Sequence, residues 1–159
     1  MARSVIDTPL GPLVVTAGEA GLLRIEHGPI ATTPDPGPSA TADAHVAQLT
    51  VEFEEYFSRR RTTFTVPLDR SRRVGVRGVV LDRLETVPYG ETISYGELAA
   101  EVGRPGAARA VGTTMATNPL PVVVPCHRVT RSGGVLGNYG WGVAAKLQLL
   151  QLEGRGSTS

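Results

Sequence analysis

Residues 118–129 read "NPLPVVVPCHRV" and contain the only cysteine of the chain, Cys126. Three valines and a proline precede the thiol, which predicts a strand that ends at the proline and leaves Cys126 on a turn. Most cysteines are small buried side chains, and reactivity rather than packing decides whether they matter. Here His127 and Arg128 follow directly, and imidazole or cationic neighbours favour the reactive thiolate. Cys126 is therefore a candidate nucleophile activated by a neighbouring base.

Composition limits the classes of protein to which the chain can belong. Its 159 residues suffice for one ordinary domain or two small ones, and 41% of them are apolar. The net charge of +1 excludes a polycation that coats nucleic acid, so any DNA contact needs a local basic patch. One cysteine excludes an internal disulfide and a multi-cysteine zinc site, and we expect no metal. The chain lacks a signal-peptide pattern and a membrane-spanning apolar run, which favours a cytoplasmic protein with no membrane partner.

The N-terminal part is predicted to be a small sheet with one helix. Short β-branched runs within residues 3–27, separated by glycine and proline, indicate antiparallel strands. Four prolines within residues 28–43 indicate a loop. Helical spacing of apolar residues predicts an amphipathic helix over 45–61, and residues 62–69 are typical of a further extended segment.

From Ser71 onward the pattern becomes mainly helical. Residues 74–87 favour a helix although they contain two glycines, each of which costs up to about 1 kcal/mol relative to alanine. Ser94 and Glu97 form a capping-box pattern at the start of the next helix, and Gly103 is suited to its C-terminus.

A further helix is expected to begin at Ala107, after a short turn. Two short helices joined in this way are typical of a helix-turn-helix, although an ordinary helical hairpin is the commoner structure. The glycine-rich residues 132–142 lack the phosphate-loop pattern. The last predicted helix spans 143–154, with Val143, Leu147 and Leu150 facing inward.

The stretch around the cysteine, together with "SYGELA", "ARAVG" and "GNYGWG", closely resembles the O6-alkylguanine-DNA alkyltransferases. The resemblance is strong over residues 87–154 and looser before them, where "TPLGPL" and the aromatic residues of the first helix carry it. It implies an α/β protein of two domains. Residues 1–70 would form a ribonuclease-H-like part, a small antiparallel sheet with a helix, and residues 71–159 a mainly helical DNA-binding and active-site domain containing the helix-turn-helix.

Members of this family bind double-stranded DNA, flip an O6-alkylated guanine out of the stack and move the alkyl group irreversibly onto their own cysteine. The resemblance thus implies a single-turnover methyltransferase that needs no cofactor and acts as a monomer. It assigns Cys126 as the alkyl acceptor and His127 as the base, which takes the thiol proton through a water molecule. Glu153 would orient that histidine, and Asn118 would be the hinge between the recognition helix and the active-site loop.

The same resemblance implies DNA-binding and pocket residues. The DNA-binding set comprises Tyr95, Arg109, Ala107, Ala108 and Arg128. Within it, Arg109 would fill the gap left by the flipped base, and the alanines would allow close approach to the minor groove. The substrate pocket would be formed by Tyr139, Gly140, Trp141, Val129 and Met115. If Trp141 lies in this pocket it should favour methyl over bulky adducts, whereas its alternative place is against the last helix near Leu147.

The sequence departs from many relatives at two places. No aromatic residue occurs within residues 71–83, and Ala116 and Thr117 stand where some relatives carry a basic residue before the hinge. Three other functions remain open: alkyl transfer from a small molecule or a specialised adduct, transcription regulation through the helix-turn-helix, and hydrolysis by a turning-over thiol.

Overall fold

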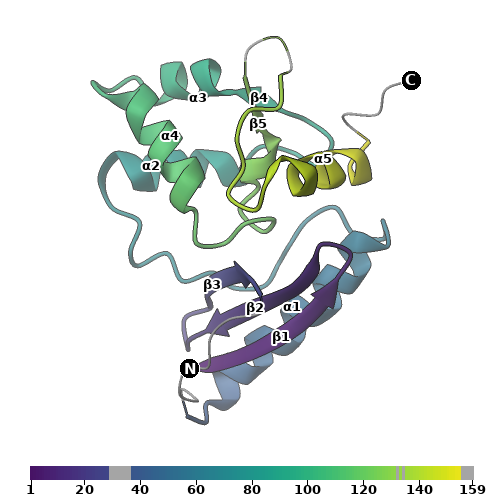
Figure 1. Cartoon of the computed structure of the whole chain (residues 1–159). Coiled ribbons are helices and arrows are strands. Elements are labelled where there is room, and N and C mark those ends of the chain that lie inside the picture. Colours follow the sequence, from purple (N-terminus) through teal and green to yellow (C-terminus); the bar gives the residue numbers. More distant parts are fainter. Residues whose placement is uncertain (29–36, 132, 134, 155–159) are drawn as a thin grey trace. The chain divides into compact units, whose positions relative to one another are not determined.

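A computed structural model describes residues 1–28, 37–131, 133 and 135–154 of the chain (Figure 1). The chain divides into two compact units, Met1–Arg70 and Ser71–Ser159, which we call the N-terminal and C-terminal units and describe one at a time. Half of the predicted 28–43 loop, residues 29–36, lies outside the described residues. Among the helices that the structure describes, none is both long and apolar enough to cross a membrane.

The N-terminal unit contains the predicted antiparallel sheet. Its strands are β1 (Ala2–Thr8), β2 (Gly11–Ala17) and β3 (Leu22–His27), in the order β1-β2-β3. β2 is the central strand, and the apolar side chains of Leu13 and Val15 are fully buried there. The sheet presents this apolar face to a single long helix, α1, which runs along it in Figure 1.

Helix α1 spans Ala40–Phe57, so it begins five residues before the predicted start at His45 and ends before the arginine run. The side chain of Ser39 accepts a hydrogen bond from the Ala42 amide and caps the helix. The small and polar residues before His45 resemble a loop in composition, but the serine cap and the alanines that follow it support the helix. Its buried face consists of Ala42, Val46, Leu49, Glu52, Phe53 and Tyr56.

Residues 62–69 form the predicted extended segment and do not become a strand of the sheet. They make one isolated parallel bridge, between Leu68 and Leu22, in which the Leu22 amide donates to the Pro67 carbonyl at 2.8 Å and the Asp69 amide to the Leu22 carbonyl at 3.0 Å. Close approach requires a glycine beside the bridge, because a Cβ atom on Gly21 would lie 2.4 Å from the Pro67 oxygen. The segment is therefore held as an extended chain by one contact rather than by a ladder.

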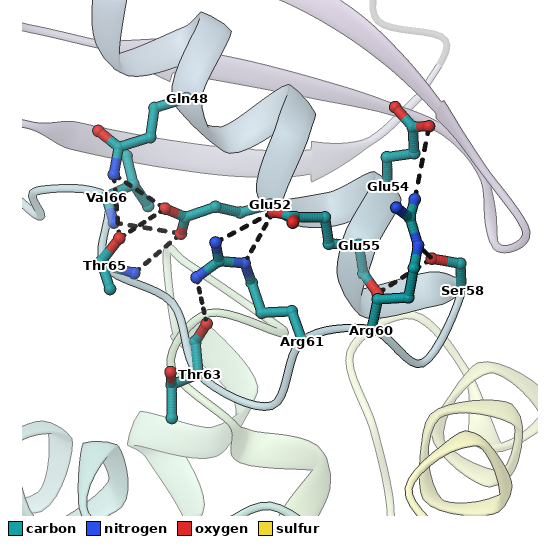
Figure 2. A network of polar contacts seen from close by, with 10 residues as sticks. All are labelled: Gln48, Glu52, Glu54, Glu55, Ser58, Arg60, Arg61, Thr63, Thr65 and Val66. Carbon is teal, nitrogen blue, oxygen red and sulfur yellow. Dashed lines mark hydrogen bonds and ion pairs between the residues drawn. The ribbon is translucent and has the colours of Figure 1, made fainter.

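A buried carboxylate fixes the same segment to α1, as Figure 2 shows. Glu52 is 3% exposed and accepts hydrogen bonds from the Gln48 side chain at 2.8 Å and the Thr65 hydroxyl at 2.7 Å. It also accepts from the Thr65 and Val66 amides, at 2.8 and 3.2 Å. Burial alone would raise the pKa of the Glu52 carboxyl, but these four donors outweigh it and lower the pKa.

The C-terminal unit is mainly helical, with one two-stranded parallel sheet in which Ile93 pairs with Val129. Its core residues are apolar side chains of several helices, among them Val80, Leu84, Leu98, Val111 and Leu149. The elements in chain order are α2 (Gly75–Glu85), β4 (Ile93–Ser94), α3 (Tyr95–Val102), α4 (Ala107–Thr117), η1 (Cys126–Arg128), β5 (Val129–Thr130) and α5 (Val143–Leu152).

Helices α3 and α4 are joined by the short predicted turn. The capping box at the start of α3 is present: the Glu97 amide donates to the Ser94 hydroxyl at 3.0 Å, and the Ser94 amide to the Glu97 carboxylate at 3.4 Å. Gly103 ends α3 with φ of 65°, and Gly106 precedes α4 with φ of 76°. Two left-handed glycines thus turn the chain between the helices.

Helix α2 shows what occupies the region without aromatic residues. A Cβ atom on Gly78 would lie 2.9 Å from the carbonyl carbon of Arg73, so the backbone before the helix packs directly against it. The Arg73 guanidinium bonds to Asp82 at 2.9 Å and also to Glu85. The space beside α2, where many relatives carry aromatic residues, is therefore filled by the backbone of Arg73 and by its ion-paired side chain.

Of the three residues predicted to face inward from helix α5, only Leu150 is buried. Val143 is 48% exposed and Leu147 is half-buried, while Lys146, Leu149 and Leu150 are buried. Apolar residues occur all round this helix, so periodicity alone does not select one face. The buried lysine lies at the functional site.

We expect Glu52→Gln to destabilise the N-terminal unit by about 1–3 kcal/mol, because buried donors lose their charged acceptor. The lowered pKa of Glu52 means that its contribution is present above the pKa of the unfolded carboxyl, about 4.5, and is lost as pH falls through the folded value. Urea unfolding at pH 7 and pH 3 should show a smaller loss on acidification in the variant than in the wild type. Glu54→Gln is the matched control, since that side chain is 76% exposed; equal effects of the two substitutions would refute the role of Glu52.

Candidate active site around Cys126

The turn that carries the cysteine is fixed by Asn118, the residue that ends α4. Its side-chain amide donates to the Val124 carbonyl at 2.9 Å, and its side-chain oxygen accepts from the Leu120 amide at 3.0 Å. Both contacts are buried, and the Cys126 amide donates to the same Val124 carbonyl at 2.8 Å. One side chain therefore connects the end of α4 to the position of the thiol.

The three valines before the thiol form a turn rather than the predicted strand. Val122 has φ of 74°, a left-handed conformation that a β-branched residue rarely adopts. Such a conformation costs about 1–3 kcal/mol and persists only where surrounding contacts enforce it. The buried valine side chains and the Asn118 bonds supply those contacts. The sequence resembled a strand because β-branched residues favour extended backbone, a preference that the Asn118 bonds override here.

The thiol of Cys126 lies in the interior, with 4% of the residue exposed. Burial raises the pKa of the thiol, while interactions with the side chains of Asn118 and Tyr139 and the positive charge of Lys146 partly offset the rise. The resting group is thus a thiol, and it needs a base to become nucleophilic. The neighbouring side chains reduce, but do not cancel, the free-energy cost of forming a buried thiolate.

His127 is fully buried beside the cysteine and bonds to a carboxylate. Its Nε2 lies 2.8 Å from Oε2 of Glu153, the residue that follows α5. Burial lowers the pKa of the imidazole, and the carboxylate only partly opposes this. Assigned as the donor to Glu153, Nε2 carries the proton, which leaves the Nδ1 lone pair free. That Nδ1 atom has no hydrogen-bond partner among the residues that the structure describes.

Arg128 is a buried third member of the group formed with His127 and Glu153. Its Nε and Nη2 donate to the two oxygens of Glu153 at 2.8 and 2.9 Å, and its Nη1 donates to the Val87 carbonyl at 2.7 Å. Burial would raise the pKa of the Glu153 carboxyl, but His127 and Arg128 together hold it well below its usual range. With 6% of Arg128 exposed, its role here is to hold Glu153, in place of the predicted DNA contact.

Lys146 is a site residue that the sequence reasoning missed. It is completely buried in the middle of α5, and its Nζ donates to the Val129 carbonyl at 2.6 Å, to the Leu136 carbonyl, and weakly to the Asn138 carbonyl at 3.5 Å. Burial lowers the pKa of this amine to about 8, although the charge of Cys126 acts in the opposite direction. The one available signal was a lysine among the apolar residues of the last helix.

A pocket of about 490 Å³ lies beside this machinery. The lining residues come from the start of α3, the last turns of α4 and the segment after β5: Tyr95, Gly112, Met115, Ala116, Arg131, Asn138, Tyr139 and Gly140. Tyr139 links the pocket to the thiol, because its side chain also interacts with Cys126. One residue of the pocket wall is therefore also a neighbour of the thiol.

Three predicted pocket residues, Met115, Tyr139 and Gly140, line this cavity, and two others lie elsewhere. Val129 is fully buried in β5, where its carbonyl binds Lys146. Trp141 is half-buried and packs edge-on against the ring of Tyr139, with centroids 6.2 Å apart; it is outside the set of described residues that line the pocket. Trp141 therefore supports a pocket residue instead of forming the wall.

The predicted DNA-binding residues lie on α3 and α4. Arg109 and Ala108 are exposed in the first turn of α4, and Ala107 is buried beneath them. Tyr95 begins α3 and lines the pocket, where its hydroxyl donates to the Asn138 carbonyl at 3.4 Å. At the other end of α4, the guanidinium of Arg77 donates to the Thr117 carbonyl at 2.9 Å. The positive charge of Arg77, from α2, thus lies beside Thr117, which with Ala116 stands where some relatives carry a basic residue.

Two family models match the chain. Residues 1–70 match the ribonuclease-like domain of 6-O-methylguanine DNA methyltransferase, and residues 76–155 match its DNA-binding domain. Among solved structures, that of Mycobacterium tuberculosis OGT in complex with DNA superposes with a TM-score of 0.80 at 40% identity, covering 97% of this chain and 93% of that one.

Curated relatives match over nearly the whole chain. The methylated-DNA–protein-cysteine methyltransferase of Mycobacterium tuberculosis H37Rv is 43% identical over 93% of this chain and 89% of its own length. The human protein of the same name is 37% identical over 97% of this chain and 81% of its own. Both the sheet unit and the helical unit are therefore shared with these relatives.

Replacement of the buried amine by Lys146→Met is expected to raise the thiol pKa, because a positive charge that favours the thiolate is lost. Alkylation of Cys126 by a small thiol reagent should slow most below pH 8 and least above it, since Lys146 itself loses its proton near pH 8. Gln151→Met, an exposed position of the same helix, is the control. Identical pH profiles for Lys146→Met and wild type would rule out this electrostatic role.

Proposed function

Because this chain belongs to the 6-O-methylguanine DNA methyltransferase family, we propose that it repairs O6-alkylguanine in double-stranded DNA by moving the alkyl group onto the sulfur of Cys126. One observation carries the proposal: a buried thiol lies next to a neutral histidine whose second nitrogen is held by an ionised carboxylate. This is the arrangement of nucleophile, base and orienting acid. The pocket beside it would hold the flipped base.

Each proton and bond in the transfer can be assigned to a group in the site. His127 Nδ1 takes the proton of the Cys126 thiol through a water molecule, and Glu153 stabilises the imidazolium that forms. The sulfur then bonds to the alkyl carbon while the bond between that carbon and O6 breaks. The electrons stay on the guanine, which takes a proton from the hydroxyl of Tyr139. The proton held by His127 then returns through water to the tyrosinate, so the net reaction moves the thiol proton to the base and leaves both side chains neutral. The products are an unmodified guanine and a cysteine thioether.

A thioether has no good leaving group, so the reaction stops after one transfer. No cofactor is needed, because the thiolate is the acceptor and the damaged base supplies the leaving group. This separates the proposal from a hydrolytic thiol enzyme, which would turn over. It also separates it from a transcription regulator, which would bind DNA without using the thiol.

DNA would be held by the helix pair α3 and α4. The exposed first turn of α4 would lie in the minor groove, where Ala108, with the small Ala107 buried beneath it, allows close approach and Arg109 fills the space of the flipped base. Tyr95 would contact the phosphate next to the target. Such contacts carry little sequence information, so binding should be nearly independent of sequence. We further propose that the protein works as a monomer in the cytoplasm, where the free thiol stays reduced.

Intact mass after exposure to excess O6-methylguanine duplex should show one methyl group per protein molecule, and peptide mapping should place it on Cys126. Cys126→Ala should gain no methyl group but still bind the duplex, because the thiol is buried. Repair of several guanines per protein molecule would exclude the single-turnover mechanism. A Cys126→Ala variant that still accepts methyl would exclude the assigned acceptor.

Arg109→Ala should slow methyl transfer from duplex DNA at least about tenfold more than transfer from free O6-methylguanine, since only the duplex requires a base to be unstacked at a cost of a few kcal/mol. Single-turnover rates on the two substrates give this comparison directly. Arg72→Ala, another exposed arginine of the C-terminal unit, serves as the control for general charge loss. Equal slowing on both substrates would place Arg109 in the fold or the pocket.

A further inference from the structure

Arg131 is a pocket residue with no role in the transfer described above. It follows β5, and its amide donates to the Val135 carbonyl at 2.7 Å. Its side chain runs across Gly137: a Cβ atom there would lie 3.3 Å from Arg131 Cγ and 3.2 Å from Cε2 of Tyr95. A glycine with φ of 73° thus lets the arginine stem and the tyrosine ring meet at the pocket wall.

The guanidinium of Arg131 adds an uncompensated positive charge to this wall. None of the described residues that line the pocket is acidic, and no carboxylate pairs with Arg131 within residues 1–28, 37–131, 133 and 135–154. Its charge is felt inside the pocket. The pKa of Lys146 falls mainly through burial, and Arg131 lowers it further. Likewise, Arg131 opposes the rise that burial causes in the pKa of Tyr95.

We propose that Arg131 makes this pocket selective for O6 substituents that end in an anionic group, such as the carboxymethyl group. This inference rests on the proposed function, because it concerns the group that the cysteine receives. A methyl group is neutral and cannot use a cation at the wall. A carboxylate can accept two hydrogen bonds from the planar guanidinium fork, and charge-assisted bonds of this kind are among the stronger ones.

The transfer step is unchanged by the charged substituent. The sulfur of Cys126 bonds to the methylene carbon, the bond from that carbon to O6 breaks, and guanine takes one proton. The carboxylate remains on the new thioether as S-carboxymethylcysteine. Arg131 is therefore a specificity-determining residue that binds the substituent, and it takes no proton or electron pair in the reaction.

The test compares two isosteric adducts in one duplex sequence, O6-carboxymethylguanine and its neutral amide, O6-carbamoylmethylguanine. In Arg131→Gln the ratio of their single-turnover rates should fall roughly two- to fivefold from the wild-type ratio, which is the scale of a partly exposed ion pair. Arg131→Lys should keep part of the preference. Raising the salt concentration should reduce the wild-type ratio, because the pair is screened. Arg72→Gln should leave the ratio unchanged.

Three results would overturn the proposal. A ratio that is the same in Arg131→Gln and wild type means that the cation does not contact the substituent. Equal slowing of methyl, carboxymethyl and carbamoylmethyl duplexes, with free O6-methylguanine unaffected, assigns Arg131 to a DNA phosphate. Wild-type protein that transfers no methyl group refutes the proposed function and this inference together, and the same assay distinguishes that case from the other two.

Discussion

The carboxylate of Glu153 has no solvent around it, and its two oxygens are divided between an imidazole and a guanidinium. Two segments of the C-terminal unit meet at this group: the short helix η1 brings His127 and Arg128, and the residue after α5 brings the acid. Through the Val87 carbonyl the same arginine also contacts the start of the segment after α2. The orientation of the base and the docking of the last helix both depend on this buried ion group, while Asn118 fixes the turn that carries the thiol.

Burying these charges costs free energy of desolvation, and removing one partner of the group costs more. Removing one partner from a buried pair costs about 3–5 kcal/mol, because the remaining charge has no solvent to stabilise it. Apolar side chains of similar volume could give the same packing more cheaply. Glu153 and Arg128 are therefore better understood as a device for fixing the histidine tautomer than as a source of net stability. Lys146 is a second buried charge with a positioning role, because its amine holds two backbone carbonyls near the pocket.

Local signals predicted most of the fold. The capping box at Ser94 and the β-branched runs before His27 each depend on neighbours in sequence, and the structure agrees with both. The errors arose where a distant contact decides the outcome. Three valines form a turn because Asn118 enforces it. The sequence around Arg128 does not indicate that its side chain binds the Glu153 carboxylate. Likewise, the sequence around Lys146 does not indicate that its amine binds backbone carbonyls. The motif identified the thiol and its base, but the cations around them required coordinates.

The bridge between Leu22 and Leu68 has a consequence for the behaviour of the N-terminal unit in concentrated solution. β3 is an edge strand, and a free edge offers unpaired amides and carbonyls to any other chain that can add a strand. The extended segment after α1 occupies the Leu22 amide and carbonyl, and Glu52 keeps that segment in place. Glu52 on the helix thus acts on the edge of the sheet indirectly, by holding the segment that covers it. The protein's own backbone thereby blocks the addition of a strand from another molecule at the beginning of β3.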